Sequence, residues 1–126
     1  MIHKLATTKV YAHCDLPCGV YDPAQARIEA ESVHKINQKY DDLTQEDKWR
    51  AVMIKEQRAE LVKHHLWVIW TDYAKPEHVE QKPDLHDLFW RATKQDGTVK
   101  KTTNVDESQK LLDLIAEVSD WFDSTK

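Results

Sequence analysis

The chain has 126 residues, of which 32% are charged, with only two glycines, four prolines and a formal net charge of −4 at pH 7. That length suits one domain with a single core, and the scarcity of glycine and proline favours an all-α fold. The mild negative charge gives no indication of a nucleic-acid or membrane partner. No apolar run approaches the ~20 residues needed to span a bilayer. We therefore expect a helical cytoplasmic protein with no nucleic-acid or membrane partner.

The first twelve residues, MIHKLATTKVYA, carry no recognisable targeting signal. They lack the continuous apolar stretch of a secretory signal and do not have the character of a transit peptide. Taken alone, residues 1–12 are expected to be a disordered terminus.

Both cysteines of the chain, Cys14 and Cys18, lie within one stretch of five residues. A disulfide framework would spread its cysteines along the chain, so this spacing indicates a metal or redox site. Pro17 and Gly19 allow the segment to turn back on itself, because proline fixes φ and glycine tolerates positive φ. From the residues alone, a zinc-binding helical module and a redox dithiol both remain open.

Four helices are predicted after this segment, joined by short connections. They span roughly residues 23–40, 44–73, 83–94 and 105–122. Asp22, Thr44 and Asn104 are the expected N-terminal caps, and Pro76 ends the second helix. The Asp96–Gly97 pair is expected to form a turn after the third helix.

Each predicted helix carries an apolar face at helical spacing. The residues expected inside are Ile28, Val33, Ile36 and Tyr40; Ile54, Leu61, Val62 and Ile69; Leu85, Leu88, Phe89 and Ala92; and Leu111, Leu114, Ile115, Val118, Trp121 and Phe122. Four amphipathic helices with short links predict an up-down four-helix bundle.

Two charged residues fall within the predicted apolar faces. Glu29 lies inside the face of the first long helix, and Arg58 lies with His65 inside that of the second. Because an unpaired buried charge is very costly, Glu29 and Arg58 are expected to pair directly or through a shared partner. A purely structural ion pair is the alternative explanation.

A second, weaker apolar stripe on the second helix consists of Trp49, Val52, Trp67 and Trp70. It exceeds what one small core needs, which indicates packing between subunits.

The segment HCDLPCGVYDP, residues 13–23, resembles the nickel hook of the nickel superoxide dismutases. The similarity continues through AQARIEAESV, IKEQRAELVKHHL and WTDY, and covers most of residues 13 to about 90. Residues 41–47 and the final third depart from the family pattern, and residues 1–12 lie outside the match. The resemblance implies a superoxide dismutase that forms dioxygen and hydrogen peroxide by Ni(III)/Ni(II) cycling, with one nickel ion per subunit.

Carried over residue by residue, the resemblance implies a role for each residue of the site. Nickel would be bound by His13, through its α-amino nitrogen and imidazole, by Cys14, through its amide nitrogen and thiolate, and by the thiolate of Cys18. The residues around it would be Asp15, Tyr21, Glu29, Arg58 and Tyr73. Glu29 and Arg58 would form a hydrogen-bonded chain with the imidazole of His13, which orients a ligating ring.

The same resemblance implies two features of the assembled protein. An α-amino nitrogen at His13 exists only after cleavage from Ala12, so residues 1–12 are expected to be a pro-segment removed by a processing peptidase, leaving a hook-plus-bundle domain of residues 13–126. The family also implies a homohexamer in which neighbouring subunits help to cover the metal.

Overall fold

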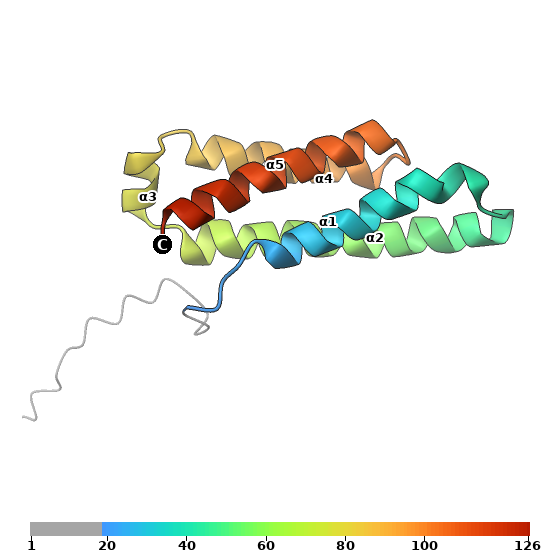
Figure 1. Ribbon diagram of the computed structural model, residues 1–126, viewed down its shortest axis with the longest axis horizontal. Coiled ribbons are helices and arrows are strands. Elements are labelled where there is room, and N and C mark those ends of the chain that lie inside the picture. Colours follow the sequence, from blue (N-terminus) through green and yellow to red (C-terminus); the bar gives the residue numbers. More distant parts are fainter. Residues whose placement is uncertain (1–18) are drawn as a thin grey trace, which may run out of the picture.

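Four long helices form a bundle, and a fifth, short helix connects the second of them to the third (Figure 1). The computed structural model describes residues 19–126, and every regular element within that range is helical. The helices are α1 (Ala24–Lys39), α2 (Gln45–Val68), α3 (Pro76–Gln81), α4 (Leu85–Lys100) and α5 (Val105–Ser124). Among these helices, none is long and apolar enough to cross a membrane.

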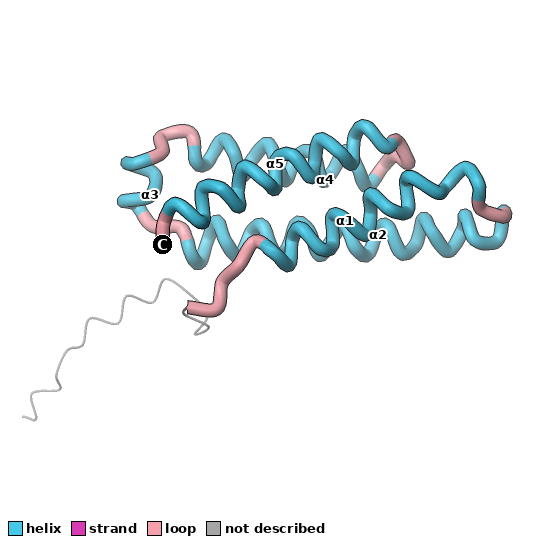
Figure 2. Tube along the Cα trace, viewed as in Figure 1, coloured by secondary structure: helices cyan, strands magenta, loops and turns pink. Residues whose placement is uncertain are grey.

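The long helices are arranged in two layers. α1 and α2 lie side by side, and α4 and α5 form the layer above them in the view of Figure 1. Each helix packs on two others, so that α1 contacts α2 and α5, and α4 contacts α2 and α5. Short connections at the ends of the bundle reverse the chain (Figure 2). The all-α, four-helix prediction is therefore confirmed, with α3 as an additional helix that was not predicted.

The predicted caps lie at or next to the helix starts. The Thr44 side chain accepts a hydrogen bond from the Asp47 backbone N–H at 3.2 Å. The Asn104 side chain accepts from the N–H groups of Asp106 and Glu107 at 2.8 and 3.3 Å. Helix α1 begins one residue later than predicted, so that Pro23 and not Asp22 is its N-cap, although the Asp22 side chain accepts the N–H of Ala24 at 2.8 Å. Side-chain oxygens at these positions satisfy backbone donors that have no partner within the helix.

Helix α2 ends in a π-helical turn, Ile69–Tyr73. The N–H of Ala74 donates to the carbonyl of Ile69 at 2.9 Å, which is a bond five residues back instead of four. Single π turns of this kind insert an extra residue into a helix. The backbone then becomes extended at Ala74 and Lys75, as expected before Pro76.

The predicted turn at Asp96–Gly97 is wrong, because α4 continues through it to Lys100. Asp96 and Val99 continue the row of buried residues along α4 after Ala92, and neither has any exposed surface. The aspartate–glycine pair is a local signal for a turn, and here the packing of a further helical turn against the bundle overrides it.

A buried lysine from α2 stabilises the C-terminal end of α4. The Lys55 ammonium donates to the carbonyls of Val99 and Lys100 at 2.9 and 3.1 Å, and also to that of Thr102. The last carbonyls of a helix have no partner within it and carry partial negative charge, so a cation there is favourable. Burial lowers the pKa of Lys55, and the neighbouring Glu56 opposes that change.

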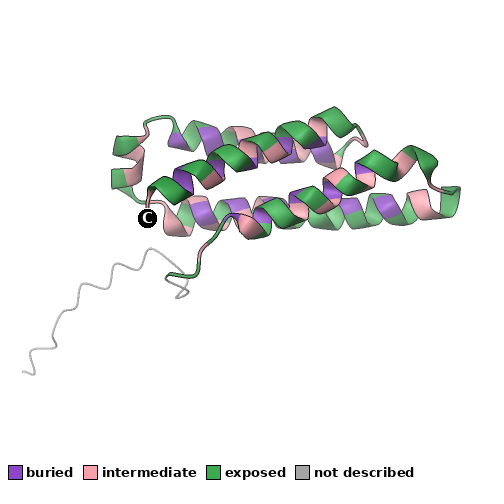
Figure 3. Cartoon of the chain, in the orientation of Figure 1, coloured by how far each residue is buried: buried purple, intermediate pink, exposed green. Residues whose placement is uncertain are grey.

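The core prediction is correct for α4 and α5. All four residues expected inside α4 are buried, as are five of those expected inside α5: Leu85, Leu88, Phe89, Ala92, Leu111, Ile115, Val118, Trp121 and Phe122. Leu114 is half-buried. Buried stretches of the helices are purple in Figure 3.

The faces predicted for α1 and α2 are partly wrong. Ile28 is 52% exposed, and Ile54 and Leu61 are each 38% exposed. Three of the predicted core residues, Val33, Val62 and Ile69, are buried. The other core positions of these helices were not predicted, and they are mostly small: Ala26, Ala30, Ala51, Ala59 and Leu66. Alanine contributes little to an apolar pattern, but its small side chain suits a close approach of two helices, so the true face is displaced around each helix from the one predicted.

Candidate metal centre

The predicted site residues fall into two groups along the chain. The proposed ligands and one neighbour lie outside the described residues: His13, Cys14, Asp15 and Cys18. The other four lie within them: Tyr21, Glu29, Arg58 and Tyr73. Between residues 19 and 126, no cluster of three or more histidine, cysteine, aspartate or glutamate side chains has the arrangement of a metal site.

The donor atoms of the hook segment fit nickel by their chemistry. The segment carries two thiols and one imidazole within six residues. Mixed nitrogen and sulfur donors are the set that suits Ni(II) in square-planar coordination. Directly after Cys18, Gly19 has a φ of +86°, the left-handed conformation that favours glycine. The positive φ predicted to be open to this glycine is therefore present, whereas the predicted turn between Cys14 and Cys18 lies outside the described residues.

Tyr21 and Tyr73 form one pair at the end of the bundle. Tyr21 precedes α1, and Tyr73 is the last residue of the π-helical turn. Their ring centroids are 6.0 Å apart with an interplanar angle of 61°, an edge-to-face contact. Tyr73 also contacts Phe122 and Trp121 of α5, at 4.6 and 6.0 Å between centroids. Tyr73, which contacts Tyr21, therefore packs on aromatic rings of α5.

Glu29 and Arg58 form a second pair between α1 and α2. One guanidinium nitrogen, Nη1 of Arg58, donates to both carboxylate oxygens of Glu29, at 3.0 and 3.2 Å. The Glu29 side chain is 15% exposed and that of Arg58 is 46% exposed. The predicted direct pairing is thus present, but Arg58 lies at the edge of the helix interface and not at the centre of a buried face.

His65 lies close enough to this pair to be influenced by its charge. Burial lowers the pKa of His65, the positive charge of His64 lowers it further, and the negative charge of Glu29 acts in the opposite direction. The Glu29 carboxylate is therefore neighbour to two basic side chains of α2, Arg58 and His65.

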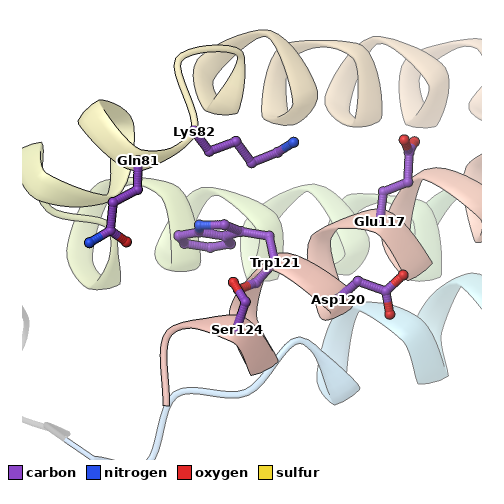
Figure 4. A pocket seen from close by; sticks show the side chains of 6 residues that line it. All are labelled: Gln81, Lys82, Glu117, Asp120, Trp121 and Ser124. Carbon is purple, nitrogen blue, oxygen red and sulfur yellow. The ribbon is translucent and has the colours of Figure 1, made fainter.

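A pocket of about 470 Å³ opens beside α5 (Figure 4). It is lined by polar and charged side chains around one aromatic ring: Gln81, Lys82, Glu117, Asp120, Trp121 and Ser124. Among the described residues, none of the four predicted site residues Tyr21, Glu29, Arg58 and Tyr73 lines it. Trp121 of its lining contacts the ring of Tyr73.

Comparison with known proteins agrees with the resemblance found in the sequence. The family model for nickel-containing superoxide dismutase matches residues 8–126. The chain is 56% identical to a superoxide dismutase [Ni] of Streptomyces seoulensis, covering 94% of this chain and 91% of the relative. It is 50% identical to a superoxide dismutase [Ni] of Streptomyces coelicolor, covering 100% and 98%.

The fold agrees as well. A native structure of nickel superoxide dismutase superimposes with a TM-score of 0.86 at 50% identity, covering 90% of this chain and 97% of that one. A structure of nickel-containing superoxide dismutase after partial X-ray-induced reduction gives the same TM-score at 54% identity and the same coverage. The chain therefore belongs to the nickel-containing superoxide dismutase family.

Proposed function

We propose that this chain is a nickel-dependent superoxide dismutase whose metal is held by His13, Cys14 and Cys18. The observation that carries the proposal is the family match over residues 8–126, which includes both cysteines of the chain. It favours nickel chemistry over the zinc-binding module and the redox dithiol that the cysteine spacing alone left open. The reaction is the conversion of superoxide to dioxygen and hydrogen peroxide.

The ligands are the amine and imidazole of His13, the amide nitrogen and thiolate of Cys14, and the thiolate of Cys18. Bound nickel supplies the one-electron exchange with superoxide. Thiolates and an amide nitrogen are strong electron donors, and they lower the reduction potential of nickel into the range needed to react with superoxide. The amine of His13 requires cleavage after Ala12, so residues 1–12 act as a pro-segment that a processing peptidase removes.

Glu29 orients the imidazole of His13, and Arg58 holds Glu29. A carboxylate bonded to a ligating imidazole fixes the direction of the ring and raises its basicity. The contact of Arg58 with both Glu29 oxygens, at 3.0 and 3.2 Å, supports this role because it holds the carboxylate in one orientation. The half-exposed guanidinium also places positive charge where an anion approaches.

Tyr21 borders the substrate pocket and limits access to it, and Asp15 and Tyr73 belong to its hydrogen-bonding surroundings. The edge-to-face contact of the two tyrosine rings and the packing of Tyr73 on aromatic rings of α5 support these roles. Rings held in this way admit a small anion and keep larger reductants from the thiolates.

Metal analysis of the processed protein tests the proposal directly. Nickel near one per subunit with superoxide turnover is the expected result, whereas zinc without turnover, or no metal with reversible disulfide formation, would overturn it. An additional alanine before His13 of the processed chain should abolish nickel binding, because the terminal amine becomes an amide. A dithiol enzyme would barely respond to that addition.

The role of Arg58 in attracting the anion has its own test. Arg58→Ala should lower the rate constant about two- to tenfold at low salt and flatten its dependence on ionic strength. Arg50→Ala is the matched control, because Arg50 also lies on α2, pairs with Asp47 at 3.4 Å and is 73% exposed. Equal salt slopes for wild type and Arg58→Ala would remove Arg58 from this role.

We further propose that the chain forms a homohexamer in the cytoplasm. Large apolar side chains on the outer face of α2 support an oligomer: Trp49, Val52, Met53 and Trp67 are 45–66% exposed in the single chain. A group of exposed apolar side chains on one helix face is commonly a protein–protein contact surface. Sedimentation of the active enzyme as a monomer would contradict this.

A further inference from the structure

The hydroxyl of Tyr73 has a defined hydrogen-bond direction. Its oxygen lies 2.6 Å from Oγ1 of Thr125, the residue that follows α5. Oγ1 of Thr125 also lies 2.6 Å from the carbonyl oxygen of Phe122. A carbonyl oxygen only accepts, so the single hydroxyl hydrogen of Thr125 is directed to Phe122. Tyr73 is therefore the donor in its bond with Thr125.

The ring of Tyr73 is also fixed on its faces. The imidazole of His78 stacks on it at 5.7 Å with an interplanar angle of 14°, and Phe122 lies 4.6 Å away. His78 is itself held, because its Nδ1 accepts the backbone N–H of Lys75 at 3.0 Å. With ring and hydroxyl both held, the phenol has little freedom to turn its hydrogen elsewhere.

We propose that Thr125 is a positioning residue for Tyr73, which keeps the phenolic hydrogen pointing into the protein and leaves the oxygen as a hydrogen-bond acceptor toward the pocket. The inference rests on the proposed role of Tyr73 at the substrate pocket. The consequence concerns the role of Tyr73 in the reaction. Tyr73 receives a hydrogen bond from a donor in the proposed substrate pocket and does not itself supply a proton to the reduced substrate.

Thr125 makes a second hydrogen bond, which could stabilise the end of α5 without any effect on Tyr73. Its hydroxyl satisfies the Phe122 carbonyl at the end of α5, as its own backbone N–H also does at 3.0 Å. Ser124 offers a matched control, because its hydroxyl donates in the same way to the carbonyl of Trp121 and makes no contact with Tyr73 in the described part of the chain. Loss of a helix-end hydroxyl alone is therefore measurable without disturbing the phenol.

The test combines turnover with a spectroscopic readout of the phenol. Ultraviolet resonance Raman bands of tyrosine distinguish a donating from an accepting hydroxyl, and they can be recorded on the metal-free protein. Thr125→Val should change these bands and lower turnover of the nickel-loaded enzyme about two- to tenfold, the effect of one hydrogen bond. Thr125→Ser, which keeps the hydroxyl, should restore both, and Ser124→Ala should change neither.

A Tyr73→Phe background separates the possible failures. If Thr125→Val causes no spectral change, or lowers turnover equally when Tyr73 is already phenylalanine, Thr125 does not act through Tyr73 and the inference is overturned. If the spectral change is present but Tyr73→Phe keeps full turnover, the proposed role of Tyr73 fails, and the functional part of the inference fails with it. Support requires a spectral change that disappears in the Tyr73→Phe background together with a turnover loss that does not add to that of Tyr73→Phe.

Discussion

The carboxyl group of Asp96 should make the stability of this protein depend on pH around neutrality. Asp96 has no exposed surface, and neither of its carboxylate oxygens has a hydrogen-bond partner among residues 19–126. Burial raises its pKa from 3.8 to about 7. The charges of Lys63 and Lys100 oppose this rise, and those of Glu60 and Glu56 add to it. An acid in such surroundings is more stable in the folded protein when it is neutral.

The sign and size follow from the two pKa values. Between pH 4 and 7, approximately, the folded chain keeps a proton that the unfolded chain has released, so stability falls as pH rises through this range and is level above it. Each tenfold change in proton affinity corresponds to about 1.4 kcal/mol, so the whole contribution is about 4 kcal/mol. It is fully present below the unfolded pKa and lost once the pH exceeds the folded one.

Asp96→Asn removes the titration while nearly preserving the shape of the side chain. Urea unfolding of wild type and variant at several pH values between 5 and 9 gives the difference in unfolding free energy at each pH. That difference should move in favour of Asn by about 2 kcal/mol between pH 5.5 and 8.5. Contributions from other groups cancel in the difference, and exposed Asp120→Asn is the control. A difference that stays constant over this range would refute the reasoning.

Four further changes have expected outcomes, and urea unfolding measures the first three. Lys55→Met should destabilise by about 2–4 kcal/mol, since it leaves the carbonyls at the end of α4 without their buried donor; an unchanged midpoint would contradict this. Gly97→Ala should stabilise by about 0.5–1 kcal/mol, because Gly97 is helical and a Cβ there meets no atom within 4 Å; destabilisation would mean that the turn prediction was nearer the truth. Asn104→Ala should cost about 1 kcal/mol by removing a cap that accepts two N–H groups, and no cost would show that water replaces it. Glu29→Gln should weaken nickel retention about 10- to 100-fold in competition with a chelator, whereas Glu31→Gln, which breaks a surface pair within α1, should not; equal retention by both would refute the role of Glu29.

The sequence predicted best what depends on neighbours along the chain. The caps Thr44 and Asn104 and the stop before Pro76 are local, and all are present. The hook segment is local too, because both thiols lie within five residues, so the sequence alone predicts a donor set there; its ligands lie outside the described residues and stay a prediction.

What the sequence could not predict depends on contacts between helices. Lys55 bonds to carbonyls more than 40 residues away, and this contact lets α4 pass through a pair that locally favours a turn. The close approach of α1 and α2 along alanines also carries almost no apolar signal. The same limit applies to the site, where Tyr73 meets Thr125 across 52 residues and nothing in the pattern around Thr125 marks it.

The π-helical turn at Ile69–Tyr73 changes the direction in which the following side chains leave the helix axis, without changing that of the core residues before it. In an α-helix each residue advances the side chain by about 100° around the axis. Shortening this turn by one residue would leave Val62 and Leu66 in their places against the bundle, yet rotate Tyr73 by about that angle and carry it away from Tyr21 and Thr125. The length of this turn therefore sets the direction of the Tyr73 phenol independently of the packing of α2 in the bundle.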